Sequence, residues 1–179
     1  NFKGLVYFNG LIFKPEKGGF LMNQETSMNL LLSYNDKDQK LKIYPSVLET
    51  SSKENINISG VFNLRDTLNP FQLNFQAKRI AVDNALPLLP QQVRAQIDSI
   101  GIKSLLDTDV RLLGRGKGVK PKVNLRFQTH PFTYDVRIGS LTKVIAEGYY
   151  TNQGDTLQEP GPLNARLTAP NVKGYFGNI

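Results

Sequence analysis

Few residues of this chain could perform catalysis or bind a metal. The sequence contains one histidine, His130, and no cysteine. Nucleophilic catalysis usually needs a serine or cysteine with a base beside it, and a zinc site usually needs several histidine or cysteine ligands. His130 directly precedes Pro131, which favours extended backbone at a strand boundary. We therefore interpret His130 as a loop histidine, and any metal site would need carboxylates alone.

The carboxylates give no sign of such a site. They lie mostly in predicted turns, and nothing in the sequence selects a pair for acid and base catalysis. Asp107 and Asp109 share one face of a predicted strand but lack the further ligands of a calcium loop. We therefore predict a protein that is not an enzyme and that holds no metal and no cofactor.

A glycine-rich basic segment, GRGKG, occupies residues 114–118. A phosphate-binding loop needs its glycines between a strand and a helix, whereas another strand is expected after this segment. We interpret it as a basic hairpin turn, which is either simply solvated or meets anionic lipid headgroups. The candidate headgroup contacts are the basic residues of this stretch, which no acid interrupts: Arg111, Arg115, Lys117, Lys120 and Lys122.

The net charge of +7 either simply serves solubility or favours an anionic partner. Nucleic acid is not expected, because the aromatic residues fall on apolar faces of predicted strands and do not interleave with the basic stretch as stacking platforms would. Phospholipid headgroups and acidic glycans are the anionic partners that fit.

The elements that carry these residues are predicted to be β-strands. Apolar and polar residues alternate with a period of two, which places successive side chains on opposite faces of a sheet. This pattern is typical of antiparallel strands with one solvated face, because strands covered on both faces read as continuous apolar runs. The clearest cases are residues 28–34, 71–77, 123–127 and 132–138. About ten strands are expected, so the sheet must curl, close or fold on itself.

One helix is expected to interrupt the strands. Pro90 suits the first helical position, Val93 and Ile97 follow at helical spacing, and Gly101 suits the left-handed exit. This spacing predicts a short amphipathic helix over residues 91–100, which would cover part of the apolar face.

The last strand is expected to follow a stiff connector, EPGP, at residues 159–162. Leu163, Ala165 and Leu167 alternate after it and are predicted to lie in that strand. The whole chain, residues 1–179, is expected to be a single β-rich domain cut from a longer protein.

A sheet with one apolar face must hide that face, and two structures could do so. One is a curved or twisted elongated sheet that forms a groove or half-barrel and contacts acyl chains. The alternative is a β-sandwich, in which the same residues form a dry core. The candidates for the apolar, lipid-contacting face are Phe71, Leu73, Phe75, Leu125, Phe127, Phe132, Tyr134 and Val136.

Several segments resemble the AsmA-like family of bacterial envelope proteins, which includes TamB-related proteins. The resemblance lies in the spacing of strands, glycines and prolines, and it includes no catalytic motif. It covers residues 56–89 closely and 105–152 more loosely. The segments that carry it are ISGVFNL (58–64), NPFQLNF (69–75), IAV (80–82), LPLL (86–89) and VIAEGYYTN (144–152).

The resemblance implies a periplasmic segment of a Gram-negative envelope protein, anchored in the inner membrane by an N-terminal helix that this chain does not include. Proteins of this family are thought to form elongated, curved sheets with an apolar groove. For this chain it implies a lipid-contacting or scaffold module in outer-membrane biogenesis or lipid transport. Phospholipid or lipopolysaccharide would be its ligand, and other envelope proteins its partners. The rival hypothesis is a β-sandwich that serves a cell-surface protein as an adhesion or glycan-binding module.

Overall fold

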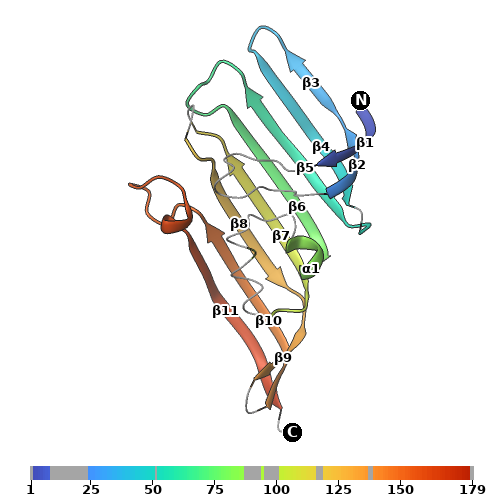
Figure 1. Ribbon diagram of the computed structural model, residues 1–179, viewed down its shortest axis with the longest axis vertical. Coiled ribbons are helices and arrows are strands. Elements are labelled where there is room, and N and C mark those ends of the chain that lie inside the picture. Colours follow the sequence, from blue (N-terminus) through green and yellow to red (C-terminus); the bar gives the residue numbers. More distant parts are fainter. Residues whose placement is uncertain are drawn as a thin grey trace.

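The computed structural model describes residues 2–8, 24–50, 52–86, 94, 101–115, 119–136 and 139–177. In that part of the chain, eleven strands form one open, antiparallel sheet (Figure 1). Their order is β1-β2-β4-β5-β6-β7-β8-β10-β11, with β3 paired to β4 and β9 paired to β10. The predicted all-β, antiparallel fold is therefore confirmed. The sandwich alternative is wrong for the described strands, because all of them belong to a single layer.

Most strands are neighbours in both sequence and space, as hairpin connections require. The strands β4, β6, β10 and β11 are the longest. The short strands β3 and β9 pair with one end of β4 and of β10, respectively (Figure 1). The bounds are β1 (Phe2–Phe8), β2 (Gln24–Leu30), β3 (Leu32–Asn35), β4 (Lys40–Thr50), β5 (Asn55–Asn63), β6 (Phe71–Ala81), β7 (Leu105–Leu113), β8 (Lys122–Thr129), β9 (Phe132–Val136), β10 (Gly139–Thr151) and β11 (Arg166–Gly177).

The described helices are two short turns. α1 (Val82–Ala85) follows β6 directly, and a 3-10 turn, η3 (Pro162–Asn164), precedes β11. The helix predicted over residues 91–100 lies outside the described residues, except for Arg94. The prediction that the last strand includes Leu163 and Ala165 is wrong, because Leu163 lies in η3 and β11 begins at Arg166; Leu167 does lie in this strand.

Two prolines lie where strand pairing is interrupted. Pro45 lies in β4 at the register shift between Ile43 and Ser46, where the partner on the other side changes from β3 to β2. Pro170 lies in β11 opposite the register shift that follows Glu147. Because proline cannot donate a hydrogen bond to the ladder, such interruptions are where a strand tolerates it.

Two other register shifts use residues in the left-handed region. Arg79 in β6 has a φ of 56°, and Lys143 in β10 has a φ of 51°. The shift at Arg79 separates Ala77 from Ile80, so these two apolar side chains are three residues apart and both remain buried. A bulge thus keeps one face apolar along the whole length of the strand.

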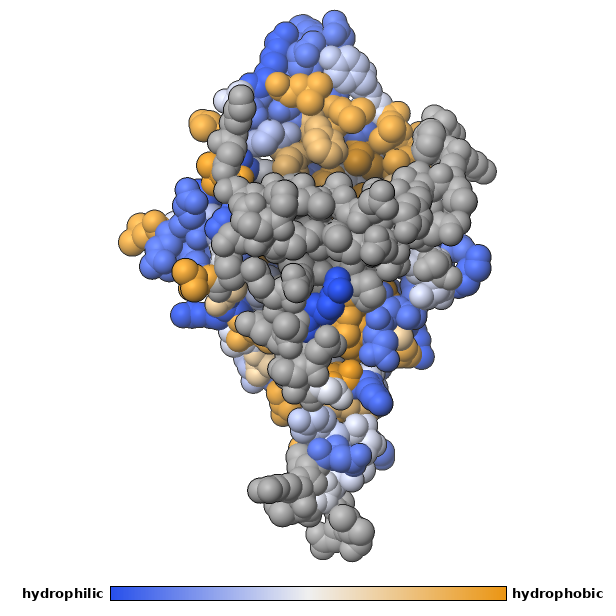
Figure 2. All heavy atoms as spheres, viewed as in Figure 1, coloured by the Kyte–Doolittle hydropathy of each residue, from blue (hydrophilic) through white to orange (hydrophobic). Residues whose placement is uncertain are grey.

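The core lies on one face of the sheet. A first cluster joins buried residues of β4 to β7 with Val82, Ala85 and Leu86 of the α1 region, and α1 lies in front of the sheet in Figure 1. A second cluster extends from β4 to β10, and Phe75 packs against both. In the same orientation, Figure 2 shows apolar side chains near the top and again below the centre of this face. The second cluster comprises Ile43, Leu73, Leu112, Val123, Leu125 and Tyr150.

Gly60 provides a test of the register between β5 and β6. A Cβ atom at this position would collide with the carbonyl oxygen of Gln72 and would lie 2.7 Å from Cδ2 of Leu73. We expect Gly60→Ala to lower the free energy of unfolding by roughly 1–3 kcal/mol, measured by urea denaturation. Ser59→Ala, on the opposite face of the same strand, is the control and should have little effect. Equal stabilities of the two variants would contradict this packing.

Candidate functional site

Strand register brings the predicted apolar residues of β6 and β8 onto one face. Phe75 pairs with Val110, and Val110 pairs with Leu125 of β8. Leu125 in turn pairs with Tyr150 of β10. Phe71, Leu73 and Phe127 lie an even number of residues from Phe75 or Leu125 along the same strands, so they share this face.

The three candidates in β9 lie toward the far end of β10. Phe132 pairs with the buried Val144, and Tyr134 pairs with Leu141; both aromatic side chains are half-buried. Val136 pairs with Gly139 through its backbone, and its side chain lies outside the described ones. That any of the eight candidates contacts lipid stays a prediction.

The opposite face of the sheet is polar and is connected by side-chain hydrogen bonds. Arg111 Nη2 donates to Gln72 Oε1 at 2.8 Å, between β7 and β6. On the same two strands, Gln76 Nε2 donates to Asp109 Oδ2 at 3.0 Å. Gln128 Nε2 of β8 donates to an oxygen of Glu147 in β10 at 3.1 Å. These cross-strand hydrogen bonds join exposed polar side chains, so this face of the sheet is solvated whereas the other face is apolar.

Burial of the apolar face is strongest at its centre. Leu112 in β7 is 2% exposed, and Leu73 and Leu125 in the flanking strands are also buried. Burial also raises the pKa of the Tyr150 hydroxyl. The centre of the predicted contact surface is therefore covered, and a ligand would reach the apolar face only nearer its sides.

The accessible apolar side chains lie at the two sides of the sheet. On β3, Leu32 and Tyr34 are exposed, and Leu32 pairs with the buried Ile43. We call these two residues the β3 margin. On β11, three exposed residues pair with residues of β10 and form what we call the β11 margin: Leu167, Val172 and Phe176.

Sequence reasoning missed both margins. The residues alternate like those of the central strands, and alternation carries no information about which strand lies at an edge. Val172 pairs with the buried Ala146 yet is itself 61% exposed, because no strand beyond β11 is described. The only available signal was the proline in this strand, since proline within a strand favours an edge position.

The basic residues predicted to contact headgroups do not form one cluster in the described part of the chain. Arg111 and Lys122 lie on the polar face, in the adjacent strands β7 and β8. Lys120 lies beside the β10–β11 loop, where a Cβ atom on Gly161 would come within 2.9 Å of its Nζ. Lys117 lies outside the described residues.

Arg115 carries a buried nitrogen, Nη1, that has no hydrogen-bond partner. A buried donor without a partner is costly, and a charged one more so. An anionic oxygen that reached this nitrogen would remove that cost, because charge-assisted hydrogen bonds are the strongest of their kind. Arg115 therefore has the best structural basis among the headgroup candidates.

His130 forms a polar cluster with residues of two other strands. Its Nε2 lies 3.0 Å from Oδ1 of Asp107, and its Nδ1 lies 3.5 Å from Nη1 of Arg79. The backbone N–H of Arg79 also donates to Oδ1 of Asp107, at 2.8 Å. The hydrogen bond from His130, aided by that of Arg79, lowers the pKa of the Asp107 carboxyl.

This cluster holds the bulge of β6 against the ends of β7 and β8. The nearby Ser104 hydroxyl donates to the carbonyl oxygens of Leu105 and His130, so it is not directed at the imidazole ring. Ser104 is therefore not aligned with His130 as a nucleophile would be with its base. Its geometry explains how Arg79 is held in the left-handed region.

Across the described ranges, no three acidic or histidine side chains come close enough together to form a metal site. Nor does any helix in those ranges have the length and apolar character to cross a membrane. Comparison with protein-family models, with curated proteins and with solved structures found no match.

The Asp107 carboxylate should contribute to stability at neutral pH. Because its pKa is lowered from 3.8 in the folded protein, this contribution is complete above 3.8 and is lost as the pH falls through the lower, folded value. We expect Asp107→Asn to reduce stability at neutral pH and to flatten the fall in stability below pH 3.8. Denaturant titrations across that pH range measure both effects, with Asp109→Asn as the control. Parallel curves for Asp107→Asn and the unchanged protein would contradict the role of the cluster.

Proposed function

We propose that this chain is a non-catalytic, lipid-contacting or scaffold module of the bacterial envelope, a periplasmic segment of an AsmA-like protein. The observation that carries the proposal is the one-sided sheet. Its apolar face is buried at the centre but exposed at the β3 and β11 margins.

Exposed apolar surface along a sheet favours a partner that covers it. Burial of apolar surface is worth about 25 cal/mol per Å², and full burial of a valine or phenylalanine about 1.5–3 kcal/mol. An acyl chain matches the margins chemically, because it needs no hydrogen bonds. A further strand of an envelope protein could cover the β11 margin by pairing with the edge of β11 that has no neighbour among the described strands, which would be the scaffold form of the same function.

The basic residues support a ligand with an anionic headgroup. Arg115 has an unpaired buried nitrogen, and Lys120 lies just before β8, beside the β10–β11 loop. Phospholipid and lipopolysaccharide both combine acyl chains with phosphate groups. Either could offer acyl chains to the apolar margins and phosphate oxygens to Arg115 or Lys120.

The rival proposal, an adhesion or glycan-binding module, assumed a sandwich with a closed core. The described strands form a single open sheet, which does not support that premise. The lipid-contacting and scaffold proposals fit an open sheet better, and the adhesion or glycan-binding hypothesis stays a prediction.

A pair of double variants on β11 tests the lipid contact. Val172→Ser with Phe176→Ser changes the apolar margin, and Lys173→Ser with Tyr175→Ser changes the other face of the same strand. Native mass spectrometry of protein purified from a bacterial envelope should show bound phospholipid for the unchanged protein and the control. The margin variant should lose at least about tenfold of this occupancy. Lipid-free spectra of the unchanged protein, or equal occupancy in both variants, would contradict the proposal.

A further inference from the structure

The loop that joins β10 to β11, residues 152–165, presents two leucines to solvent. Leu157 is 95% exposed and Leu163 is 102% exposed, more than any other large apolar residue described. Isolated exposed leucines are common on protein surfaces. Here two of them lie in one loop, almost wholly in water, so the contacts that hold the loop decide whether they stay exposed.

The loop is held by its own polar groups. Gln153 is buried, and its Nε2 donates to the carbonyl oxygen of Gln158 at 2.9 Å. Asn164 Nδ2 donates to the carbonyl oxygen of Asp155 at 2.8 Å, and Asp155 N donates back to Asn164 Oδ1 at 2.7 Å. Pro160 is fully buried. The exposure of the leucines is therefore fixed by an ordered loop conformation.

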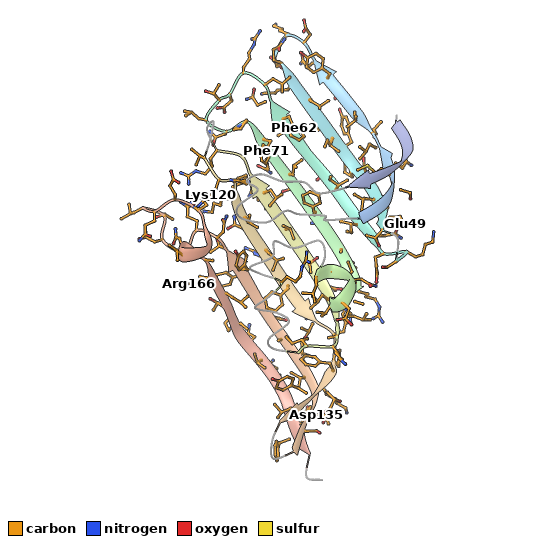
Figure 3. The ribbon with its side chains drawn as sticks, in the orientation of Figure 1. Glu49, Phe62, Phe71, Lys120, Asp135 and Arg166 are labelled. Atoms are coloured by element: carbon orange, nitrogen blue, oxygen red, sulfur yellow. The ribbon has the colours of Figure 1, made fainter. Side chains whose placement is uncertain are left out.

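The loop is also fastened to the start of β8. Asn152 Oδ1 accepts a hydrogen bond from Val123 N at 2.8 Å, and Asn152 Nδ2 donates to the carbonyl oxygen of Pro121 at 2.9 Å. Lys120 approaches the loop at Gly161. Figure 3 shows Lys120 and Arg166 on the side of the molecule from which this loop projects. The leucines are thus presented from a basic corner of the sheet.

The acids of the loop offset part of this charge. Asp155 is exposed, and its carboxylate accepts hydrogen bonds from Leu157 N at 2.9 Å and from Gln158 Nε2 at 3.0 Å. Glu159 is exposed as well. Lys120, Arg166 and Lys122, which begins β8, outnumber these two carboxylates by one, so the corner keeps a small positive charge.

We infer that the β10–β11 loop docks onto the surface of an anionic lipid bilayer. Leu157 and Leu163 insert among the headgroups, and Lys120 and Arg166 contact lipid phosphates. Exposed apolar side chains flanked by lysine and arginine are typical of interfacial membrane contacts. Leucine, by contrast, is under-represented among the residues that dominate protein–protein binding. This docking uses a surface separate from the sheet margins and does not depend on acyl-chain binding there.

Vesicle flotation of the whole chain tests the inference. The unchanged protein should float with vesicles of phosphatidylcholine and phosphatidylglycerol, and much less with phosphatidylcholine alone. Leu157→Ser with Leu163→Ser should weaken binding to the anionic vesicles at least about tenfold. Lys120→Glu with Arg166→Glu should abolish the preference for anionic vesicles, and added salt should weaken binding of the unchanged protein.

Two controls separate this inference from the proposed function. The β11-margin variant, Val172→Ser with Phe176→Ser, should float like the unchanged protein even if it loses bound phospholipid. The leucine variant should keep its melting temperature, because both side chains are already exposed. Flotation of the leucine variant equal to that of the unchanged protein would overturn the inference. Failure of the unchanged protein to float with either vesicle would overturn it as well and would point to a protein partner for the loop.

Discussion

The structure depends on keeping one face of a single sheet apolar across many strands. The described strands form no second sheet that could pack over a misaligned strand. A register slip of one residue in any strand would exchange its apolar and polar faces. The register shifts in β4 and β6 therefore come with a change in spacing. Ala77 and Ile80 are three residues apart where the rest of β6 alternates by two, and Ile43 and Ser46 repeat this in β4. The polar ladder on the other side imposes the same register independently, because Gln72 and Gln76 reach partners on β7 only in that alignment.

Much of this fold could be predicted from the sequence, because alternation is a local signal. The patterns at residues 71–77, 123–127 and 132–138 correspond to β6, β8 and β9. The bulges could not be predicted, since Arg79 and Lys143 occupy conformations that glycine usually marks. Leu163 continued the alternation of the last strand, yet hydrogen bonds from Asn164 to the preceding loop hold that region in a turn. Hydrogen bonds within the β10–β11 loop overrode the alternating pattern there.

The candidate site was predicted less completely than the fold. The alternation in the sequence identified the apolar face. The residues predicted to contact lipid include several at the centre of that face, where Leu73 and Leu125 are buried. Exposure depends on whether a strand has a neighbour, and that is a property of the whole sheet. His130 was expected to be a loop histidine between two strands, and it does lie between β8 and β9. The sequence could not show that the fold brings Asp107 and Arg79 to it from other strands. Pairings of this kind are invisible until strand order is known.

The buried centre and the exposed margins of the sheet separate two roles that often compete within one protein, stabilising the fold and presenting a surface to partners. Residues such as Leu112 and Ile80 carry the folding free energy, whereas Leu32 and Val172 add little to it because water already reaches them. Substitutions along the two outer strands can therefore accumulate over generations without unfolding the molecule. Side chains along the rim of the sheet can vary while the interior keeps its packing, so the same architecture can carry outer surfaces of different chemistry.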